Sequence, residues 1–194
     1  MNPKLKKTKI YSLTISLNHW TPRIWRRLWI RDDMKLHEVA VVLYSCMGWC
    51  GYHLSEIRVH NKSYGDRSID PPPKLLEWTR YTFGDIAKDG LTQFQFIYDF
   101  GDNWEMTVKV REEKKLDENA PYPVCVNGEN AAPPEDVGGY PGFDHFIKVM
   151  KNKKHPEYKQ LSDWWGDESF DPSYFSIDEV NSIIQDKETF LQEL

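Results

Sequence analysis

The sequence predicts an α+β fold: a mainly antiparallel sheet of about five strands with helices packed on it. Alternation of apolar and polar residues, which is typical of strands, marks residues 11–17, 24–30, 53–60, 94–98 and 104–110. Apolar residues recur at helical spacing in residues 34–48, and further helical segments follow near the C-terminus. A length of 194 residues suits one domain, so we expect residues 1–194 to form a single domain.

The first half of the chain predicts three strands and one helix. Residues 11–17 place their apolar side chains on one face, whereas residues 24–30 are bulky on both faces. Asp33 has the short acceptor side chain of an N-cap, so we expect a helix that begins at Met34 and ends at Gly48 or Gly51. Residues 53–60 then predict the third strand.

A β-hairpin is the clearest local prediction. Its apolar residues all occupy even positions, at 94, 96 and 98 and again at 104, 106, 108 and 110. Facing residues of an antiparallel pair sum to a constant, so the two sets share a face only if that sum is even. A two-residue turn at Gly101 and Asp102 gives an odd sum. We therefore predict that Tyr98 faces Trp104 across a turn of three or five residues centred on Gly101.

Turn and capping residues predict the structure of the remaining segments. Thr82 and Asp85 resemble a capping box, which predicts a short helix that Gly90 stops. Residues 121–142 are rich in proline and glycine and predict a loop, within which residues 133–136 resemble a helix start that Gly138 and Gly139 stop. Helical segments are expected at residues 143–153, 156–164 and 176–191.

Compartment is predicted from the cysteines and the apolar stretches. The chain has three cysteines and no CxxC pair, which provides neither a disulfide framework nor a zinc knuckle. The longest apolar stretch, residues 39–52, is shorter than the roughly 20 residues of a membrane span. Residues 11–17 alternate instead of forming the apolar run of a signal peptide. We therefore expect a cytoplasmic protein without a membrane segment.

Charge is unevenly distributed, although the net charge is only −5. Residues 1–35 carry nine basic and two acidic residues, a net charge of +7, whereas residues 156–194 carry two basic and ten acidic residues, a net charge of −8. This basic N-terminal segment could contact the phosphates of a nucleic acid. The alternative is that the two ends neutralise each other across the fold.

An acidic cluster is the first candidate site. Its members are Asp99, Asp102 and Glu105 of the hairpin, Glu135 and Asp136 of the proline-rich loop, and Asp167 and Asp171. Carboxylates brought together from separate loops are the ligands of divalent cations such as magnesium or calcium, and such a metal could activate water for hydrolysis. The alternative is that these carboxylates bond backbone amides in turns and at a helix start.

Histidines, a cysteine and arginines provide further candidates. His37 and His53 flank the first helix and, with His145, could form a zinc or iron site, or one of them could be a general base. The alternative for His37 is packing between helix and strand. Cys125 could join such a site or act as a thiol nucleophile.

Arginine and tryptophan alternate along residues 20–29, as on surfaces that bind nucleic acids. Strand alternation divides them, however, placing Arg27 on one face with Trp25 and Trp29, and Arg26 on the other. The alternative is therefore core tryptophans with arginines that pair with the acidic C-terminal half. Motifs of nucleotide-binding, dinucleotide-binding, serine-hydrolase and zinc-protease sites do not occur in the sequence.

Several short stretches, in order over about residues 10–185, resemble the plasmid pRi ORF-3-like family. They are Pro22–Arg27, Leu36–His37, Gly48–Trp49 with His53–Leu54, Tyr98–Glu105, Pro133–Gly139, and Trp165–Gly166 with Phe170–Pro172. The family pattern often has a second histidine where this chain has Ser55, which argues against a two-histidine metal ligand. The resemblance implies an α+β domain and supplies no function, and some family members accompany insertion sequences.

These observations predict an intracellular, non-catalytic binding or accessory module, associated with mobile elements through the family resemblance. Its binding surface would be the hairpin tip and the loop of residues 133–142, docked together to line the main concave surface. The candidate residues are Asp99, Asp102, Asn103, Trp104, Glu105, Glu135, Asp136, His37, His53, Arg26 and Arg27.

The alternative function is a metal-dependent hydrolase that uses the acidic cluster. A divalent metal, held by Asp99, Asp102, Glu135 and Asp136, is the only cofactor that the sequence suggests. Arg26 or Arg27 could take the place of the metal in neutralising these carboxylates. The partner would be an unidentified protein or nucleic acid.

Overall fold

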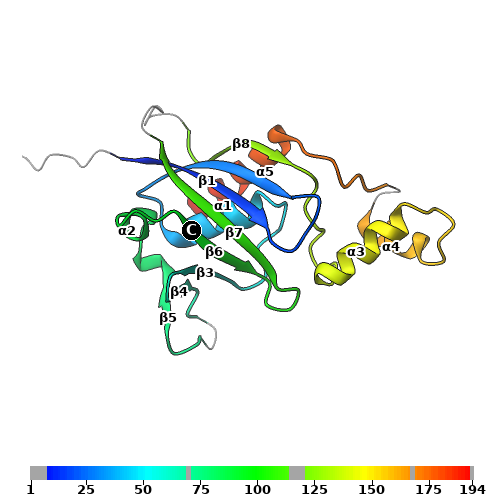
Figure 1. Cartoon of the computed structure of the whole chain (residues 1–194), viewed down its shortest axis with the longest axis horizontal. Coiled ribbons are helices and arrows are strands. Elements are labelled where there is room, and N and C mark those ends of the chain that lie inside the picture. The colour runs from blue at the N-terminus through cyan, green and yellow to red at the C-terminus, as the bar shows by residue number, and fades with distance from the viewer. Residues whose placement is uncertain (1–7, 69–70, 114–120, 167–168, 193–194) are drawn as a thin grey trace, which may run out of the picture.

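The computed structural model describes residues 8–68, 71–113, 121–166 and 169–192 and has an α+β architecture (Figure 1). Eight strands within these residues form one sheet in the order β5-β4-β3-β6-β7-β1-β2-β8. The strands are β1 (Ile10–Leu17), β2 (Trp25–Arg31), β3 (Ser55–Val59), β4 (Lys62–Gly65), β5 (Leu75–Glu77), β6 (Gln93–Tyr98), β7 (Trp104–Glu113) and β8 (Val124–Glu129). Neighbours are antiparallel except β4 and β5, which are parallel.

Five α-helices and a 3-10 turn accompany the sheet in the described residues. They are α1 (Leu36–Ser45), η1 (Trp78–Arg80), α2 (Phe83–Ala87), α3 (Gly139–Met150), α4 (Tyr158–Trp165) and α5 (Ile177–Gln192). The helices α1 and α5 lie behind the central strands β1 and β7 in Figure 1, and α5 packs on both α1 and β8. The helices α3 and α4 pack together at one end of the molecule.

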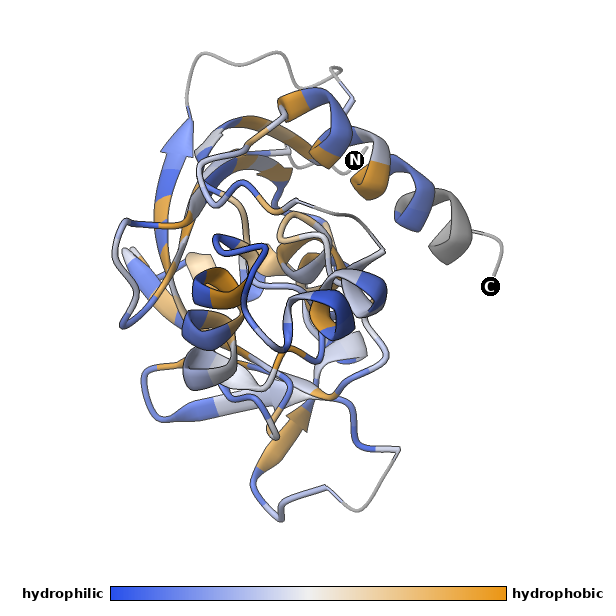
Figure 2. Cartoon of the chain, turned by 90° about the vertical axis from the view of Figure 1, so that its right-hand side faces the viewer, coloured by the Kyte–Doolittle hydropathy of each residue, from blue (hydrophilic) through white to orange (hydrophobic). Residues whose placement is uncertain are grey.

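The core lies between the sheet and the helices behind it. Leu13 and Ile15 of β1, Phe96 of β6 and Met106 of β7 have no exposed surface, and neither has Leu43 of α1. Viewed from the end that carries α3 and α4, the helices show alternating hydrophilic and hydrophobic bands, as expected of elements with one buried face (Figure 2). Burial of these apolar surfaces is the main favourable contribution to folding.

The predicted hairpin is confirmed. Tyr98 is paired with Trp104, and five residues, 99–103, form the turn. The helix α2 also begins as predicted, because Thr82 caps it and exchanges hydrogen bonds with Asp85. Both features depend on residues that are close in the sequence, so the local pattern was sufficient.

The predicted number of strands was too small, since eight are found where about five were expected. The additional strands are β4 and β5, with four and three residues, and β8, which lies in the stretch predicted to be a loop. Strands as short as β4 and β5 carry no readable alternation, and β8 lies among prolines and glycines, which predicted a loop. They form because each completes the backbone hydrogen bonds of a longer neighbour, and β8 does so along β2, with an irregularity between Arg27 and Leu28.

The first helix is shorter than predicted at both ends. Asp33 does not cap it, because the Asp33 carboxylate accepts hydrogen bonds from Arg31 at 2.9 and 2.6 Å. Lys35 occupies the N-cap position, and its backbone amide donates to Glu38 at 2.6 Å. The helix ends at Ser45, before Gly48, which has a left-handed φ of +83° in the turn that follows. No helix in the described residues is both long and apolar enough to cross a bilayer.

Candidate functional site

The turn of the hairpin is shaped by two polar residues with left-handed backbone conformations. Asp99 has φ +55° and Asn103 has φ +53°, a region that Asp and Asn adopt more readily than most residues. One carboxylate oxygen of Asp99, Oδ1, accepts a hydrogen bond from the amide of Gly101 at 2.9 Å. The other oxygen, Oδ2, lies 3.7 Å from Nε2 of His53. The expected bond to a turn amide is therefore present, and it leaves one oxygen of Asp99 for the site.

The Pro–Gly loop, residues 133–138, is fixed against the hairpin by hydrogen bonds from three sides. The indole of Trp49 donates to the carbonyl of Pro133 at 2.9 Å, and the amide of Gly138 donates to Asp102 Oδ2 at 3.1 Å. Glu135 accepts from the amide of Cys50 at 2.7 Å and from the hydroxyl of Tyr98. The prediction that this loop lies against the hairpin is confirmed.

The local structure of the Pro–Gly loop differs from the sequence prediction. Residues 133–136 do not start a helix, and Asp136 has φ +59°, which no right-handed helix allows. Gly138 and Gly139 begin α3 instead of ending a helix. Gly139 is required there, because its φ is +66° and a Cβ would lie 2.9 Å from the carbonyl oxygen of Asp102.

The chain between α1 and β3 completes the site. The hydroxyl of Tyr52 donates to Asp136 Oδ2 at 2.6 Å, and Nε2 of His53 lies 2.9 Å from Asp136 Oδ1. The pKa of the Tyr52 phenol is raised, mainly by its hydrogen bond to Asp136, so the phenol stays protonated and serves as a donor. Tyr52 thus orients the Asp136 carboxylate so that its other oxygen faces the imidazole.

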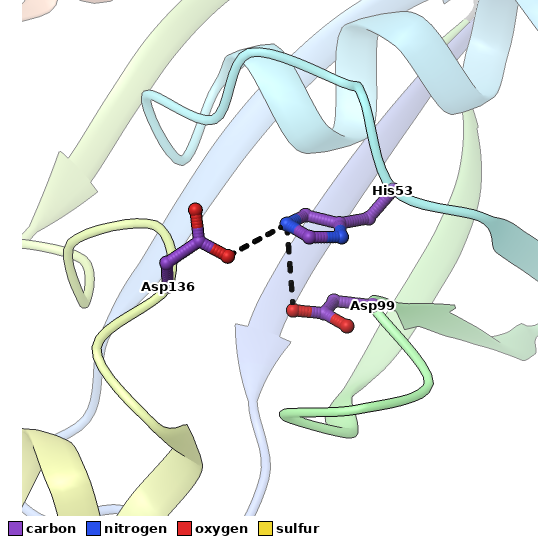
Figure 3. A group of neighbouring side chains, drawn as sticks. All are labelled: His53, Asp99 and Asp136. Atoms are coloured by element: carbon purple, nitrogen blue, oxygen red, sulfur yellow. Dashed lines mark hydrogen bonds and ion pairs between the residues drawn. The ribbon is translucent and has the colours of Figure 1, made fainter.

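His53, Asp99 and Asp136 form the centre of this site, which we call the His–Asp–Asp cluster (Figure 3). One ligand atom from each residue lies within 4.8 Å of the other two. The side chains of His53 and Asp99 are 25% and 11% exposed, while that of Asp136 is 51% exposed. The cluster is therefore open to solvent on the Asp136 side and closed on the hairpin side. A cation bound between them can satisfy both carboxylates.

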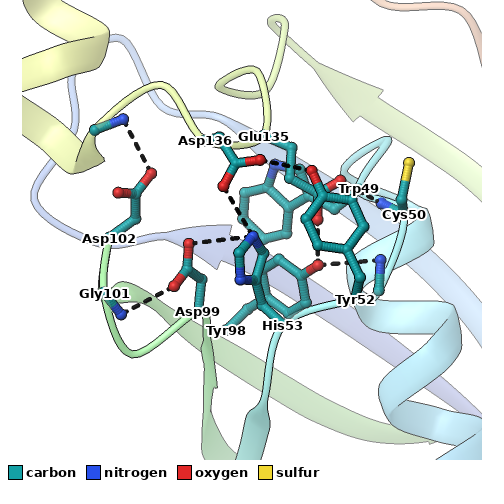
Figure 4. A network of polar contacts seen from close by, with 12 residues as sticks. Trp49, Cys50, Tyr52, His53, Tyr98, Asp99, Gly101, Asp102, Glu135 and Asp136 are labelled. Carbon is teal, nitrogen blue, oxygen red and sulfur yellow. Dashed lines mark hydrogen bonds and ion pairs between the residues drawn. The ribbon is translucent and has the colours of Figure 1, made fainter.

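A buried aromatic layer supports the cluster from below (Figure 4). The ring of Tyr98 stacks on that of Trp49 with centroids 4.9 Å apart and meets His53 edge-on at 5.8 Å. Burial, followed by the hydrogen bond to Glu135, raises the pKa of Tyr98, so its hydroxyl remains a donor to that carboxylate. This packing and the contacts with both carboxylates together hold the His53 ring in position.

The structure separates the four predicted metal ligands into two groups. Asp99 and Asp136 converge on His53, whereas Asp102 and Glu135 are occupied by the hydrogen bonds that hold the loop. The expectation that Glu135 and Asp136 cap a helix is wrong, since both bond the 50–53 segment. The four-carboxylate cluster on which the hydrolase alternative depended does not form among the described residues. Of the wider acidic cluster, Asp171 accepts a hydrogen bond from Ser173, and Asp167 lies outside the described residues.

Of the remaining candidates, three belong to the hairpin and two histidines lie elsewhere. Asn103 donates to Glu105, two residues further along the chain, at 3.1 Å, and Trp104 between them is 1% exposed. His37 lies on α1, outside the group of residues that meets His53, and His145 pairs with Glu157 at 2.5 Å.

Arg26 and Arg27 were wrongly expected to neutralise the acidic residues. Arg26 is buried on the helix-covered face of β2, where it donates to backbone carbonyls. Arg27 lies on the opposite face, 5.6 Å from the ring centroid of Trp25, which is half-buried and outside the core. Among the described residues, no ion pair joins residues 8–35 to the acidic C-terminal segment. His53 is the group that contacts the acids.

Cys125, the proposed thiol nucleophile, is buried in β8, where burial raises its thiol pKa. The prediction that the hairpin and loop line the main concave surface is also wrong, because cavities of about 460 and 580 Å³ lie among other residues. Sequence reasoning missed Trp49, Cys50 and Tyr52 as site residues. The sequence signals for them were the glycine on each side of Trp49 and Cys50, which marks a fixed turn, and the family resemblance that includes Gly48–Trp49.

Comparison with known proteins extends these observations to relatives. The model of the family described as "Plasmid pRiA4b ORF-3-like protein" matches residues 9–179. The chain is 26% identical over 178 residues to "Uncharacterized protein y4hQ" of Sinorhizobium fredii (strain NBRC 101917 / NGR234), and the match covers 91% of each protein.

Among solved structures, the fold is similar to that of the protein of unknown function MM3350 from Methanosarcina mazei Go1. The TM-score is 0.77 at 30% sequence identity, and the match covers 90% of this chain and 98% of the other. These relatives are named as uncharacterised or of unknown function, so they assign no reaction to the site. From the family match over residues 9–179 and these similarities, the chain belongs to the plasmid pRiA4b ORF-3-like family.

Proposed function

We propose that the chain is a single-domain, non-catalytic binding module whose binding surface is the hairpin tip together with the Pro–Gly loop. The observation that carries the proposal is the convergence of His53 Nε2 with carboxylate oxygens of Asp99 and Asp136, all within 4.8 Å. These donors come from three segments that hydrogen bonds hold together, as a preformed site requires. Loops fixed on a rigid scaffold are where proteins usually carry binding function.

The ligand that fits this donor set is a first-row divalent cation such as Zn²⁺. An imidazole nitrogen with two carboxylate oxygens suits such ions, whereas Mg²⁺ and Ca²⁺ prefer oxygen ligands alone. Three protein donors leave at least one coordination position for a group from a partner. The cation would therefore join the module to an acidic or imidazole-bearing partner at the exposed Asp136 side of the cluster.

Cellular context follows from other features. The three cysteines, Cys46, Cys50 and Cys125, are free, which is in accord with a reducing cytoplasmic location. The plasmid named in the family description supports an association with mobile elements.

The experiment is thermal unfolding of the apo protein with ZnCl₂, MnCl₂ or MgCl₂ added singly, followed by isothermal titration of each ion. At about 100 times its Kd, a bound ion stabilises the folded state by about 2.7 kcal/mol, which raises Tm by roughly 5–10 °C in a chain of this length. We expect this rise with Zn²⁺ and none with Mg²⁺.

Two variants locate the site, and a third is the matched control. His53→Gln and Asp136→Asn should each abolish the Zn²⁺-induced rise, because each removes one ligand. His145→Gln removes an exposed histidine that also pairs with a carboxylate, at 2.5 Å, and should keep the full rise. The proposal fails if the wild type shows no rise, or if His53→Gln retains it.

A further inference from the structure

Arg26 is a buried cation on the helix-covered face of β2. The residue is 4% exposed, and every acceptor of its hydrogen bonds is a neutral backbone carbonyl. Nε donates to Cys46 at 3.1 Å, and Nη1 donates to Trp25 at 2.9 Å and to Glu129 at 3.0 Å. The Nη2 group makes no hydrogen bond to any residue within the described ranges.

The charge of Arg26 has no counter-ion within the part of the chain that the structure describes, where no carboxylate lies within ion-pair distance of it. A guanidinium stays protonated in proteins, so burial does not neutralise it. An unpaired buried charge is costly unless a partner of opposite charge is supplied. The fold thus keeps a cation where an anion would stabilise it.

A cavity of about 460 Å³ opens beside Arg26, between the end of α1 and the start of α5. This volume lies within the usual range of small-molecule sites. Its walls are mostly apolar and aromatic, with Met47, Phe170, Phe175, Val180 and Ile183 among the lining residues. The guanidinium of Arg26 lies over the ring of Phe175, 4.6 Å from its centroid.

Backbone packing holds Phe175 and Arg26 together at the cavity wall. A Cβ on Gly128 of β8 would lie 2.6 Å from the Phe175 ring and 2.8 Å from Cδ of Arg26. Only a residue without a side chain allows this approach. The arginine is therefore placed by the fold and is not free to swing into solvent.

Within the described part of the chain, two acidic residues also line the cavity, and both are bonded to neighbours. Asp171 accepts from the hydroxyl of Ser173 at 2.6 Å, and Glu179 accepts from that of Tyr174 at 2.5 Å. Among the lining residues that the structure describes, Arg26 is the only cationic one. Because repulsion by these two carboxylates grows with the charge of a bound anion, a ligand with a single negative charge suits the cavity better than a phosphate dianion does.

We propose that this cavity binds a small monocarboxylate with an apolar or aromatic body. The carboxylate accepts a charge-assisted hydrogen bond from Nη2 of Arg26. The body lies among Met47, Phe170 and Ile183, where its burial contributes the rest of the affinity. The site is separate from the His–Asp–Asp cluster and does not depend on it.

The test compares acids with neutral analogues of the same shape. Titration calorimetry of the wild type would use 1-naphthoate and octanoate, each beside its primary amide. We expect each acid to bind at least tenfold more tightly than its amide. Tryptophan fluorescence should change when either acid binds, because Trp165 also lines the cavity.

Variants assign the preference to Arg26. Arg26→Met should remove the preference for acid over amide, and Arg27→Met, its neighbour on the opposite face, should retain it. Should Arg26→Met not fold, Ile183→Trp, which fills the cavity and leaves Arg26 intact, should abolish binding of both compounds. Equal binding of acid and amide by the wild type, binding of neither acid, or unchanged binding by Ile183→Trp would each overturn the proposal.

Discussion

Replacement of Tyr98 by phenylalanine tests whether a single buried hydroxyl holds the Pro–Gly loop on the hairpin. Tyr98 has no exposed surface, and its hydroxyl donates to Glu135 and accepts from the amide of Gly51 at 3.0 Å. Phenylalanine keeps the ring, and with it the stack on Trp49 at 4.9 Å. The substitution therefore removes two hydrogen bonds and leaves the packing unchanged.

The expected magnitude follows from these two bonds. A hydrogen bond to a charged group contributes about 1.5–3 kcal/mol, and a neutral one about 0.5–1.5 kcal/mol. Glu135 keeps the amide of Cys50 as a donor at 2.7 Å, and Gly51 is only half-buried, so water can replace part of the loss. We therefore expect Tyr98→Phe to lower the free energy of unfolding by about 2–3 kcal/mol.

Urea unfolding at pH 7, followed by tryptophan fluorescence, measures the change. The control is Tyr174→Phe, because Tyr174 also donates to a carboxylate, Glu179 at 2.5 Å, but is 52% exposed. We expect the control substitution to lower the free energy of unfolding by about 0.5 kcal/mol or less. A double-mutant cycle with Glu135→Gln should show coupling of at least about 1 kcal/mol. If Tyr98→Phe lowers the free energy of unfolding no more than the control does, the Tyr98 hydroxyl does not hold the loop on the hairpin.

Three further expectations concern the glycines, the tyrosines and the charge distribution. Gly142→Ala would place a Cβ 1.9 Å from the carbonyl oxygen of Val137 and should lower the free energy of unfolding in urea by at least about 2 kcal/mol. Gly48→Ala, at φ +83° with open space around it, should lower it by only about 1 kcal/mol. Equal losses of stability in the two variants would contradict the steric argument. Burial raises the pKa of Tyr140 to about 12, so the folded state keeps a proton that the unfolded chain releases near pH 10. Stability should therefore fall between about pH 10 and 12, and Tyr140→Phe should reduce that fall in thermal unfolding at graded pH; an unchanged fall would exclude Tyr140 as its source. DNA binding measured by fluorescence anisotropy should be weak and salt-sensitive, because only the N-terminal segment of residues 1–35 is basic in a chain of net charge −5. Nanomolar binding that survives about 200 mM salt would contradict this.

Local patterns in the sequence determined the features that depend on neighbouring residues. The parity of the aromatic positions gave the register of Tyr98 with Trp104, because alternation along a strand fixes which residues share a face. Thr82 and Asp85 gave the start of α2, because a capping box is complete within four residues. The residues 133–139 and 98–105 also carried the family resemblance, which the match over residues 9–179 bears out.

Only the tertiary structure decided which groups meet. His53 and Asp136 are 83 residues apart in the sequence, and no local pattern relates them. The edge strand β8 forms because β2 offers unpaired backbone groups, and the Pro–Gly loop bends toward His53 because Trp49, Cys50 and Tyr98 hold it there. The sequence likewise predicted Arg26 to be one of several surface cations. In the structure it is buried, because the helices α1 and α5 cover its face of the sheet. Long-range packing, which local periodicity does not encode, is the physical reason that the Arg26 cavity and the contact of His53 with the two aspartates emerge only from the fold.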